Sequence, residues 1–166
     1  MASKSGGSAT ERKTVNMLNE FMEKDGFAYR LKQSRFASQI IDVLLDSRIY
    51  GYYAIECKSI KFTTNKKDVG RPIYFNQYFT TSKKDNSHQI NNISEFIHKS
   101  GRVGIFLIEL RRGPGHKNEM YAMSWKRLEK KFNAGENNIS WDYIFKYAIP
   151  FEPEHFFKKF KFRMEK

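Results

Sequence analysis

The chain has 166 residues, 40% of them hydrophobic and 16% aromatic, so it can bury one core but is too short for a second full domain. Thirty Lys and Arg residues against eighteen Asp and Glu residues leave a net charge of +12, which indicates a polyanionic partner or an acidic membrane surface. No apolar run approaches the ~20 residues of a membrane span, and the first residues lack the apolar stretch of a signal peptide. We therefore expect a cytoplasmic protein that binds nucleic acid and no membrane.

The amino-terminal third predicts a helix followed by three strands. Residues 1–7 are typical of a flexible tail, and we expect a single domain over residues 8–166. The apolar stripe of the first helix consists of Val15, Leu18 and Met22, with Gly26 as its stop. Strand-like segments follow at about 27–32, 38–46 and 50–60.

The rest of the chain predicts alternating helices and strands after a long polar and aromatic connection, roughly 61–86. A helix capped by Ser87 and ended by Gly101 comes first, and a buried strand follows it. A hairpin leads to a strand at 119–123, and Ser124 can cap a further helix to about Phe132. The last forty residues show no clear periodicity. This order of elements predicts an α/β domain with a mixed sheet.

The third predicted strand carries two opposite charges among its apolar residues. Side chains alternate along a strand, so Glu56 and Lys58 share one face while Ile55 and Cys57 share the other. Cys57 is the one cysteine of the chain, so neither an intramolecular disulfide nor a zinc site is expected, and it is interpreted as a core residue.

A third charged residue is expected beside this pair. Asp42 lies fourteen positions before Glu56, across what looks like a hairpin, so the two carboxylates are predicted to lie side by side. Close carboxylates repel each other unless a cation lies between them, and hard oxygen ligands suit Mg²⁺ or Mn²⁺. Lys58 would then face the substrate. Such a trio suits phosphodiester hydrolysis.

The spacing of Asp42, thirteen intervening residues and then Glu56-Cys57-Lys58 resembles the D-(D/E)xK signature of restriction-endonuclease-like nucleases. Glu11-Arg12 at the start of a helix, then DGFAYR, DVLL and IECKS, is similar to archaeal-type Holliday-junction resolvases. Downstream, SHQINNISEFI followed by GRVGIFLIEL is similar to the glutamine-bearing helix and strand of bacterial RecU-type resolvases. The connection 61–86 and the last forty residues match neither family.

The resemblance implies a restriction-endonuclease-like α/β core, with a mixed central sheet flanked by helices. It implies a Mg²⁺-dependent endonuclease, with Mn²⁺ as a substitute and no small-molecule cofactor, that resolves four-way DNA junctions. Paired symmetric nicks would leave 5′-phosphate and 3′-hydroxyl ends. By position, the resemblance makes Asp42, Glu56 and Glu11 the metal ligands, Lys58 the catalytic lysine and Gln89 a further catalytic residue.

Some of these residues have structural alternatives. Glu11 falls on the apolar side of its helix, but Ser8 three positions earlier completes a capping box that would use its carboxylate. Gln89 lies on the stripe of its helix and is either a contact for the lysine, metal water or phosphate, or a satisfied buried glutamine. Glu56 and Lys58 could form an ion pair that serves only the fold.

Candidate DNA contacts lie along the basic segments and the loop before Asp42, where resolvases carry a phosphate-contacting serine. The candidates are Arg12, Lys13, Arg30, Ser34, Arg35, Ser38, Arg111, Arg112 and Lys117. The alternatives are ordinary turn residues for the serines and solvated faces for the cations.

Two other functions and an oligomeric state remain to be tested. A site-specific or repair nuclease of the same fold is one alternative, and a non-catalytic basic DNA-binding protein is the other. A homodimer is expected because a four-way junction has two-fold symmetry. Candidate interface residues are the aromatic connection 71–79 and the tail residues Phe156, Phe157, Phe160 and Phe162, which could instead belong to the core.

Overall fold

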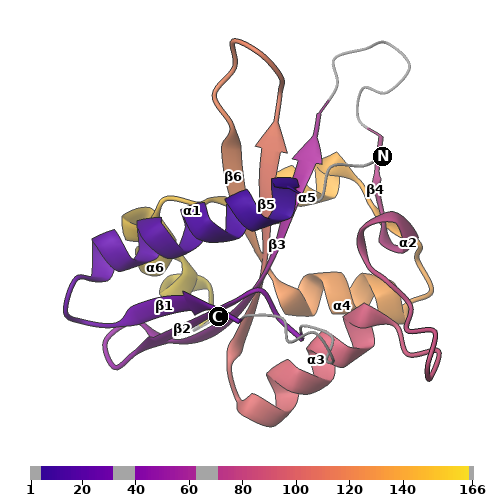
Figure 1. The fold of residues 1–166 in the computed structure, drawn as a ribbon, viewed down its shortest axis with the longest axis horizontal. Helices are drawn as coiled ribbons and strands as arrows, with labels where there is room; N and C mark the ends of the chain where they lie inside the picture. The colour runs from indigo at the N-terminus through magenta and orange to yellow at the C-terminus, as the bar shows by residue number, and fades with distance from the viewer. Residues whose placement is uncertain (1–4, 32–39, 63–70, 165–166) are drawn as a thin grey trace.

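The computed structural model describes residues 5–31, 40–62 and 71–164 (Figure 1). The helices are α1 (Ser5–Met22), α2 (Phe75–Tyr78), α3 (Gln89–Ser100), α4 (Trp125–Asn133), α5 (Trp141–Tyr147) and α6 (Pro153–Met164). The strands are β1 (Phe27–Arg30), β2 (Val43–Ser47), β3 (Gly51–Lys61), β4 (Ile73–Tyr74), β5 (Val103–Arg111), β6 (Glu119–Ser124), β7 (Asn138–Ile139) and β8 (Ile149–Pro150).

A mixed sheet in the order β1-β2-β3-β5-β6-β8 forms the centre of the molecule. Strands β3 and β5 run parallel, joined by a crossover that contains α3, and the other neighbouring pairs are antiparallel. Strands β4 and β7 pair separately. The predicted α/β class with a mixed sheet flanked by helices is confirmed. Among the described helices, none is both long and apolar enough to cross a bilayer.

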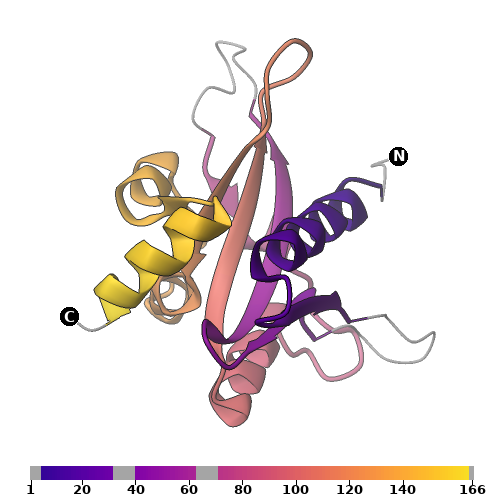
Figure 2. The same cartoon turned by 90° about the vertical axis from the view of Figure 1, so that its left-hand side faces the viewer.

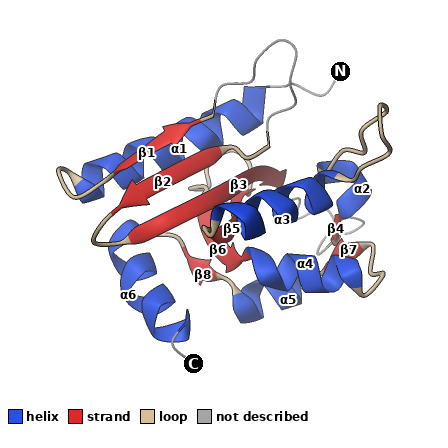
Figure 3. Ribbon diagram, turned by 90° about the horizontal axis from the view of Figure 1, so that it is seen from below, coloured by secondary structure: helices blue, strands red, loops and turns tan. Residues whose placement is uncertain are grey.

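The sheet separates two hydrophobic cores because residues of a strand alternate between its faces. On one face α1 and α6 pack over residues such as Ile55, Cys57 and Leu107. On the other face α2, α3, α4 and α5 pack over residues such as Ala54 and Phe106. Figure 3 shows α3, α4 and α5 gathered together, away from α1. Cys57 is buried, as the alternation predicts.

The hairpin between β2 and β3 forms as predicted, with Ser47 opposite Gly51 and Val43 opposite Ile55. The predicted strand 38–46 lies partly outside the described residues, and β2 itself begins only at Val43. Asp42 immediately precedes β2. Its carboxylate Oδ2 accepts a hydrogen bond from the Cys57 backbone N–H of β3 at 2.8 Å. A side chain therefore takes the place of a backbone acceptor where the β2–β3 ladder ends.

Two predicted helix starts are wrong. Helix α1 begins at Ser5, so the expected tail boundary at residue 7 falls inside the helix, since each residue added to a formed helix gains a hydrogen bond. Helix α3 is capped by His88, whose Nδ1 accepts the Ile90 N–H at 3.2 Å. Ser87 bonds instead to Asp85. The predicted stop at Gly101 is confirmed by its left-handed conformation, with φ of 66°.

The carboxy-terminal region has regular structure that the sequence pattern does not reveal. Helix α6 places Phe156, Phe157 and Phe160 in the core with α1, and the connection 71–79 buries Phe75 and Phe79 in the other core. These residues are therefore unavailable as the dimer contacts predicted for them. The side chain of Phe162 lies outside those described.

Candidate active site

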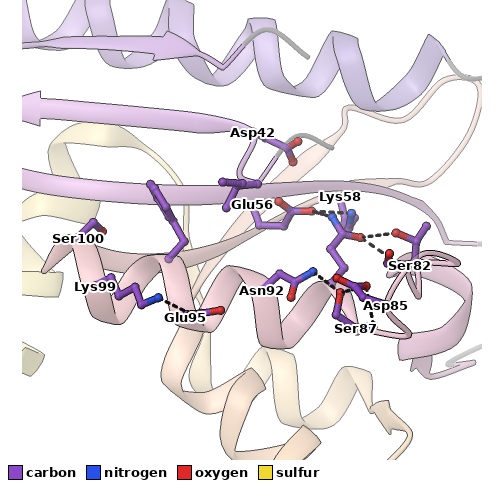
Figure 4. A pocket seen from close by; sticks show the side chains of 14 residues that line it. Asp42, Glu56, Lys58, Ser82, Asp85, Ser87, Asn92, Glu95, Lys99 and Ser100 are labelled. Carbon is purple, nitrogen blue, oxygen red and sulfur yellow. Dashed lines mark hydrogen bonds and ion pairs between the residues drawn. The ribbon is translucent and has the colours of Figure 1, made fainter. Parts of the chain in front are cut away.

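A pocket of about 990 Å³ lies between the segment just before β2, the middle of β3 and helix α3 (Figure 4). It contains three predicted catalytic residues on the sheet and Gln89 at the start of α3. The complete lining is Ile40, Asp42, Glu56, Lys58, Thr80, Ser82, Asp85, Ser87, Gln89, Asn92, Glu95, Phe96, Lys99 and Ser100.

The two strands position the charged trio by pairing. The β2–β3 register pairs Val43 with Ile55, and one further step places Asp42 beside Glu56. Lys58, two residues along the same face of β3, donates from Nζ to Glu56 Oε1 at 2.7 Å. The predicted common face is thus confirmed. The Glu56 side chain is 1% exposed, so this ion pair is shielded from water.

Gln89 joins the site from the opposite side. Its amide Nε2 donates to Glu56 Oε1 at 3.2 Å, while its Oε1 accepts the backbone N–H of Thr80 at 3.1 Å. Both ends of the amide are therefore held. The amide of Gln89 thus contacts the carboxylate that also binds Lys58.

The burial of these groups changes their protonation. Burial, followed by the neighbouring Glu56 carboxylate, raises the pKa of Asp42 to about 8. Burial also raises the pKa of Glu56, although the Lys58 ammonium opposes that change. Burial would lower the pKa of Lys58, but the Glu56 carboxylate outweighs it and raises this pKa. The raised pKa values mean that the protein alone does not fully stabilise the ionised forms of both Asp42 and Glu56.

This charge distribution fits a divalent cation. Four carboxylates and two ammonium groups line the pocket, although the whole chain carries +12. Asp42 and Glu56 offer adjacent oxygen donors of the kind that Mg²⁺ and Mn²⁺ prefer. Among the described residues, no three His, Cys, Asp or Glu side chains gather as a metal site.

Glu11, the third predicted ligand, is buried in the second turn of α1 but engages a different partner. Arg30 of β1 binds Glu11 Oε2 through Nε at 2.8 Å and through a terminal nitrogen at 2.6 Å. Ser8 lies inside α1, so it is not the helix cap that the capping-box alternative required. The role of Glu11 as a metal ligand stays a prediction.

The predicted DNA contacts are distributed over several surfaces. Ser34, Arg35 and Ser38 lie outside the described residues. Lys13 pairs with Glu109 at 3.4 Å, and Arg112 pairs with Glu119 at 3.1 Å. Arg12 and Lys117 are exposed.

Lys117 lies on the β5–β6 hairpin, which projects beyond the helices in Figures 1 and 2. Arg111, at its base, has a buried Nε without a hydrogen-bond partner among the described residues. DNA contact by these residues stays a prediction.

Residues of the connection 61–86 also line the site, although no sequence motif singled them out. Phe79 lies under Lys58, with the ammonium 4.8 Å from the ring centroid. Thr80, Ser82 and Asp85 form the wall opposite β3. The only signal was the aromatic density of 71–79, which is equally typical of a core.

Comparison with known proteins finds a similar structure but no similar sequence. No family model matches the chain, and no curated protein sequence matches it. Its structure is similar to the 1.6 Å structure of Hjc, a Holliday junction resolvase from the archaeal hyperthermophile Archaeoglobus fulgidus. The TM-score is 0.55 at 17% sequence identity, over 93% of this chain and 97% of that chain. The chain therefore shares the fold of that structure.

Proposed function

We propose that the protein is a metal-dependent DNA endonuclease that resolves four-way junctions. The observation that carries this proposal is the meeting of Asp42, Glu56 and Lys58 in one pocket, at the positions that the D-(D/E)xK resemblance assigned. The similarity of the fold to a Holliday junction resolvase supports the substrate class.

In this proposal Asp42 and Glu56 hold Mg²⁺ or Mn²⁺, with Glu11 as a further candidate ligand. The cation, when bound, polarises the phosphoryl oxygen and lowers the pKa of a bound water. Lys58 stabilises charge that develops on the phosphate, because its ammonium opens onto the pocket beside Glu56. Gln89 orients the Glu56 carboxylate through its hydrogen bond.

Hydrolysis would add the oxygen of water to phosphorus and break the bond between phosphorus and the 3′ oxygen. The 3′ oxygen takes up a proton, so the products are 5′-phosphate and 3′-hydroxyl ends. Cations around the pocket would hold the flanking phosphates, with Lys117 and Arg112 on the β5–β6 hairpin beyond the carboxyl end of β3.

We further propose that the working species is a homodimer, because each chain offers one Asp42, Glu56 and Lys58 set and resolution needs two nicks. Light scattering at micromolar concentration should give twice the mass of the 19.7 kDa chain. A monomer that makes both cuts in one binding event on an extruded cruciform contradicts this part.

The deciding experiment compares cleavage of a four-way junction, a linear duplex and single strands of the same sequence, with Mg²⁺ and at matched salt. Paired nicks in the junction alone are expected. Equal cutting of the linear duplex would favour the site-specific or repair nuclease. Tight binding without cleavage in Mg²⁺ or Mn²⁺ would favour the non-catalytic DNA-binding protein.

A further inference from the structure

Lys58 has a second partner that the nuclease signature does not include. Its ammonium contacts both the Glu56 carboxylate, at 2.7 Å, and the ring of Phe79, with 4.8 Å to the centroid. A cation over an aromatic face is attracted by the negative charge of that face. The ring is therefore a second contact for the ammonium besides Glu56.

Phe79 is well fixed for this purpose. It is 2% exposed, and its backbone N–H donates to Phe75 at the start of α2 at 2.8 Å. Its ring packs against Phe106 of β5, with centroids 5.9 Å apart, and edge-on against Trp125 of α4 at 6.1 Å. The ring is thus anchored to the sheet and to a second helix, so it forms a rigid support.

The residue after Phe79 supports the same carboxylate by another route. The Thr80 N–H holds Gln89, which donates to Glu56. Phe79 therefore contacts Lys58, and the next residue, Thr80, contacts Gln89. Lys58 and Gln89 are the two groups that donate to Glu56 Oε1. This segment resembles neither resolvase family in sequence, yet it forms a wall of the catalytic pocket.

We propose that Phe79 is a positioning residue that holds the Lys58 ammonium at the phosphate. The reason is the flexibility of lysine: its four-carbon stem has many rotamers, and a single ion pair leaves the ammonium free to move around the carboxylate. Misplacement of a catalytic group by about 1 Å can cost a hundredfold in rate. This inference rests on the proposed nuclease function.

The test measures single-turnover cleavage of a four-way junction with enzyme in excess. Phe79→Leu should lower the cleavage rate by about tenfold or more while junction affinity stays within about twofold. Phe79→Tyr keeps the ring and should restore most of the rate. Phe156→Leu is the matched control, because Phe156 is also 2% exposed but lies in the core on the other face of the sheet. It should lose similar stability and keep the wild-type rate.

A spectroscopic measurement tests the contact itself. In protein labelled with ¹³C-lysine, the ε-methylene signal of Lys58, identified by its absence in Lys58→Arg, should be shifted upfield by the Phe79 ring. The shift should vanish in Phe79→Leu and persist in Phe156→Leu. If Phe79→Leu does not fold, the upfield shift of the Lys58 signal in the wild-type spectrum still tests the contact.

The outcomes separate this inference from the function on which it rests. A wild-type protein that cuts no DNA defeats the proposed function, and the inference with it. An active wild type whose Phe79→Leu variant cuts at the normal rate defeats the inference alone. Equal rate losses in the Phe79→Leu and Phe156→Leu variants, or an unshifted Lys58 signal in the wild type, also overturn it.

Discussion

Gln89 donates a hydrogen bond to the Glu56 carboxylate at 3.2 Å, although 33 positions separate them in the sequence. The same Glu56 oxygen accepts the Lys58 ammonium. Two donors on one oxygen limit the rotation of the carboxylate. Its other oxygen is therefore presented in one direction.

Replacing Gln89 by Ala should consequently lower the cleavage rate by about 10- to 100-fold, the usual effect of losing a residue that orients a ligand. Junction affinity should change little, since the carboxylate remains. Gln77→Ala on α2 is the control, because Gln77 is exposed outside the catalytic pocket. Wild-type turnover by Gln89→Ala would make Gln89 a structural glutamine.

Asp42→Asn and Glu56→Gln should each abolish Mg²⁺-dependent cleavage while junction binding is kept or strengthened. Each change removes a proposed metal ligand, and at a pH above the Asp42 pKa of about 8 the Asp42 change also removes a negative charge that repels phosphate. Rates come from a gel assay and affinities from fluorescence anisotropy without metal. The matched control is Glu154→Gln on α6, whose side chain is 66% exposed. Near-normal cutting by either site variant in Mg²⁺ contradicts the metal assignment.

Lys58→Met keeps the length of the stem but removes the ammonium, so turnover should be lost while the fold persists. Circular dichroism and thermal melting test the fold, and the single-turnover rate tests catalysis. Lys158→Met, whose side chain is 71% exposed, should leave both unchanged. If Lys58→Met unfolds the protein, the Glu56–Lys58 pair serves the fold.

The logarithm of the DNA-binding constant should fall linearly with the logarithm of the salt concentration, with a slope of about −0.9 per neutralised phosphate. Lys117→Ala should reduce that slope by about 0.9 if the β5–β6 hairpin contacts a phosphate. Lys158→Ala on α6 is the control and should leave the slope unchanged. Identical slopes for wild type and Lys117→Ala would exclude the hairpin contact. Preference for the junction over linear duplex should persist at high salt, because shape supplies it.

Glu109 should make stability depend on pH in the acid range. Burial alone would raise the pKa of its carboxyl, but hydrogen bonds from Thr10 and Asn118 and the nearby Lys13 ammonium hold it below its usual value. A carboxyl with a lowered pKa stabilises the fold above its unfolded pKa of about 4.3, and this contribution is lost as pH falls through the folded value.

Glu109→Gln should therefore lower the free energy of unfolding at pH 7 by about 1–3 kcal/mol, and its deficit against wild type should shrink toward pH 3. Urea unfolding at both pH values measures this. Glu20→Gln, which replaces an exposed carboxylate of α1, is the control. A deficit that stays the same or grows on acidification would be the opposite of the expected sign.

Local periodicity was sufficient to predict much of the sheet. The alternation along residues 50–60 predicted that Glu56 and Lys58 share a face opposite Cys57, and the structure confirms it. The hairpin before β3 was predictable because the turn between two strands is short. These features depend on neighbours in the chain, so the sequence determines them almost alone.

Other features depended on contacts between distant segments. His88 caps α3 because the turn before it gives Ser87 another partner in Asp85. Phe156 and Phe157 belong to the core because α6 packs beside α1, and no periodicity within the tail encodes that neighbour.

The candidate site also has one part that local sequence predicts and another that depends on contacts between distant segments. The sequence by itself determined that the three charged residues lie close together. The β2–β3 hairpin brings Asp42 beside Glu56, and the alternation of side chains along β3 places Glu56 and Lys58 on one face. Only the tertiary structure decided what surrounds them: Phe79 under the ammonium and Gln89 on the carboxylate. The physical reason is that the first set is brought together by hydrogen bonds of adjacent strands. The second depends on where α2 and α3 pack, which is set by burial of apolar surface across the whole core.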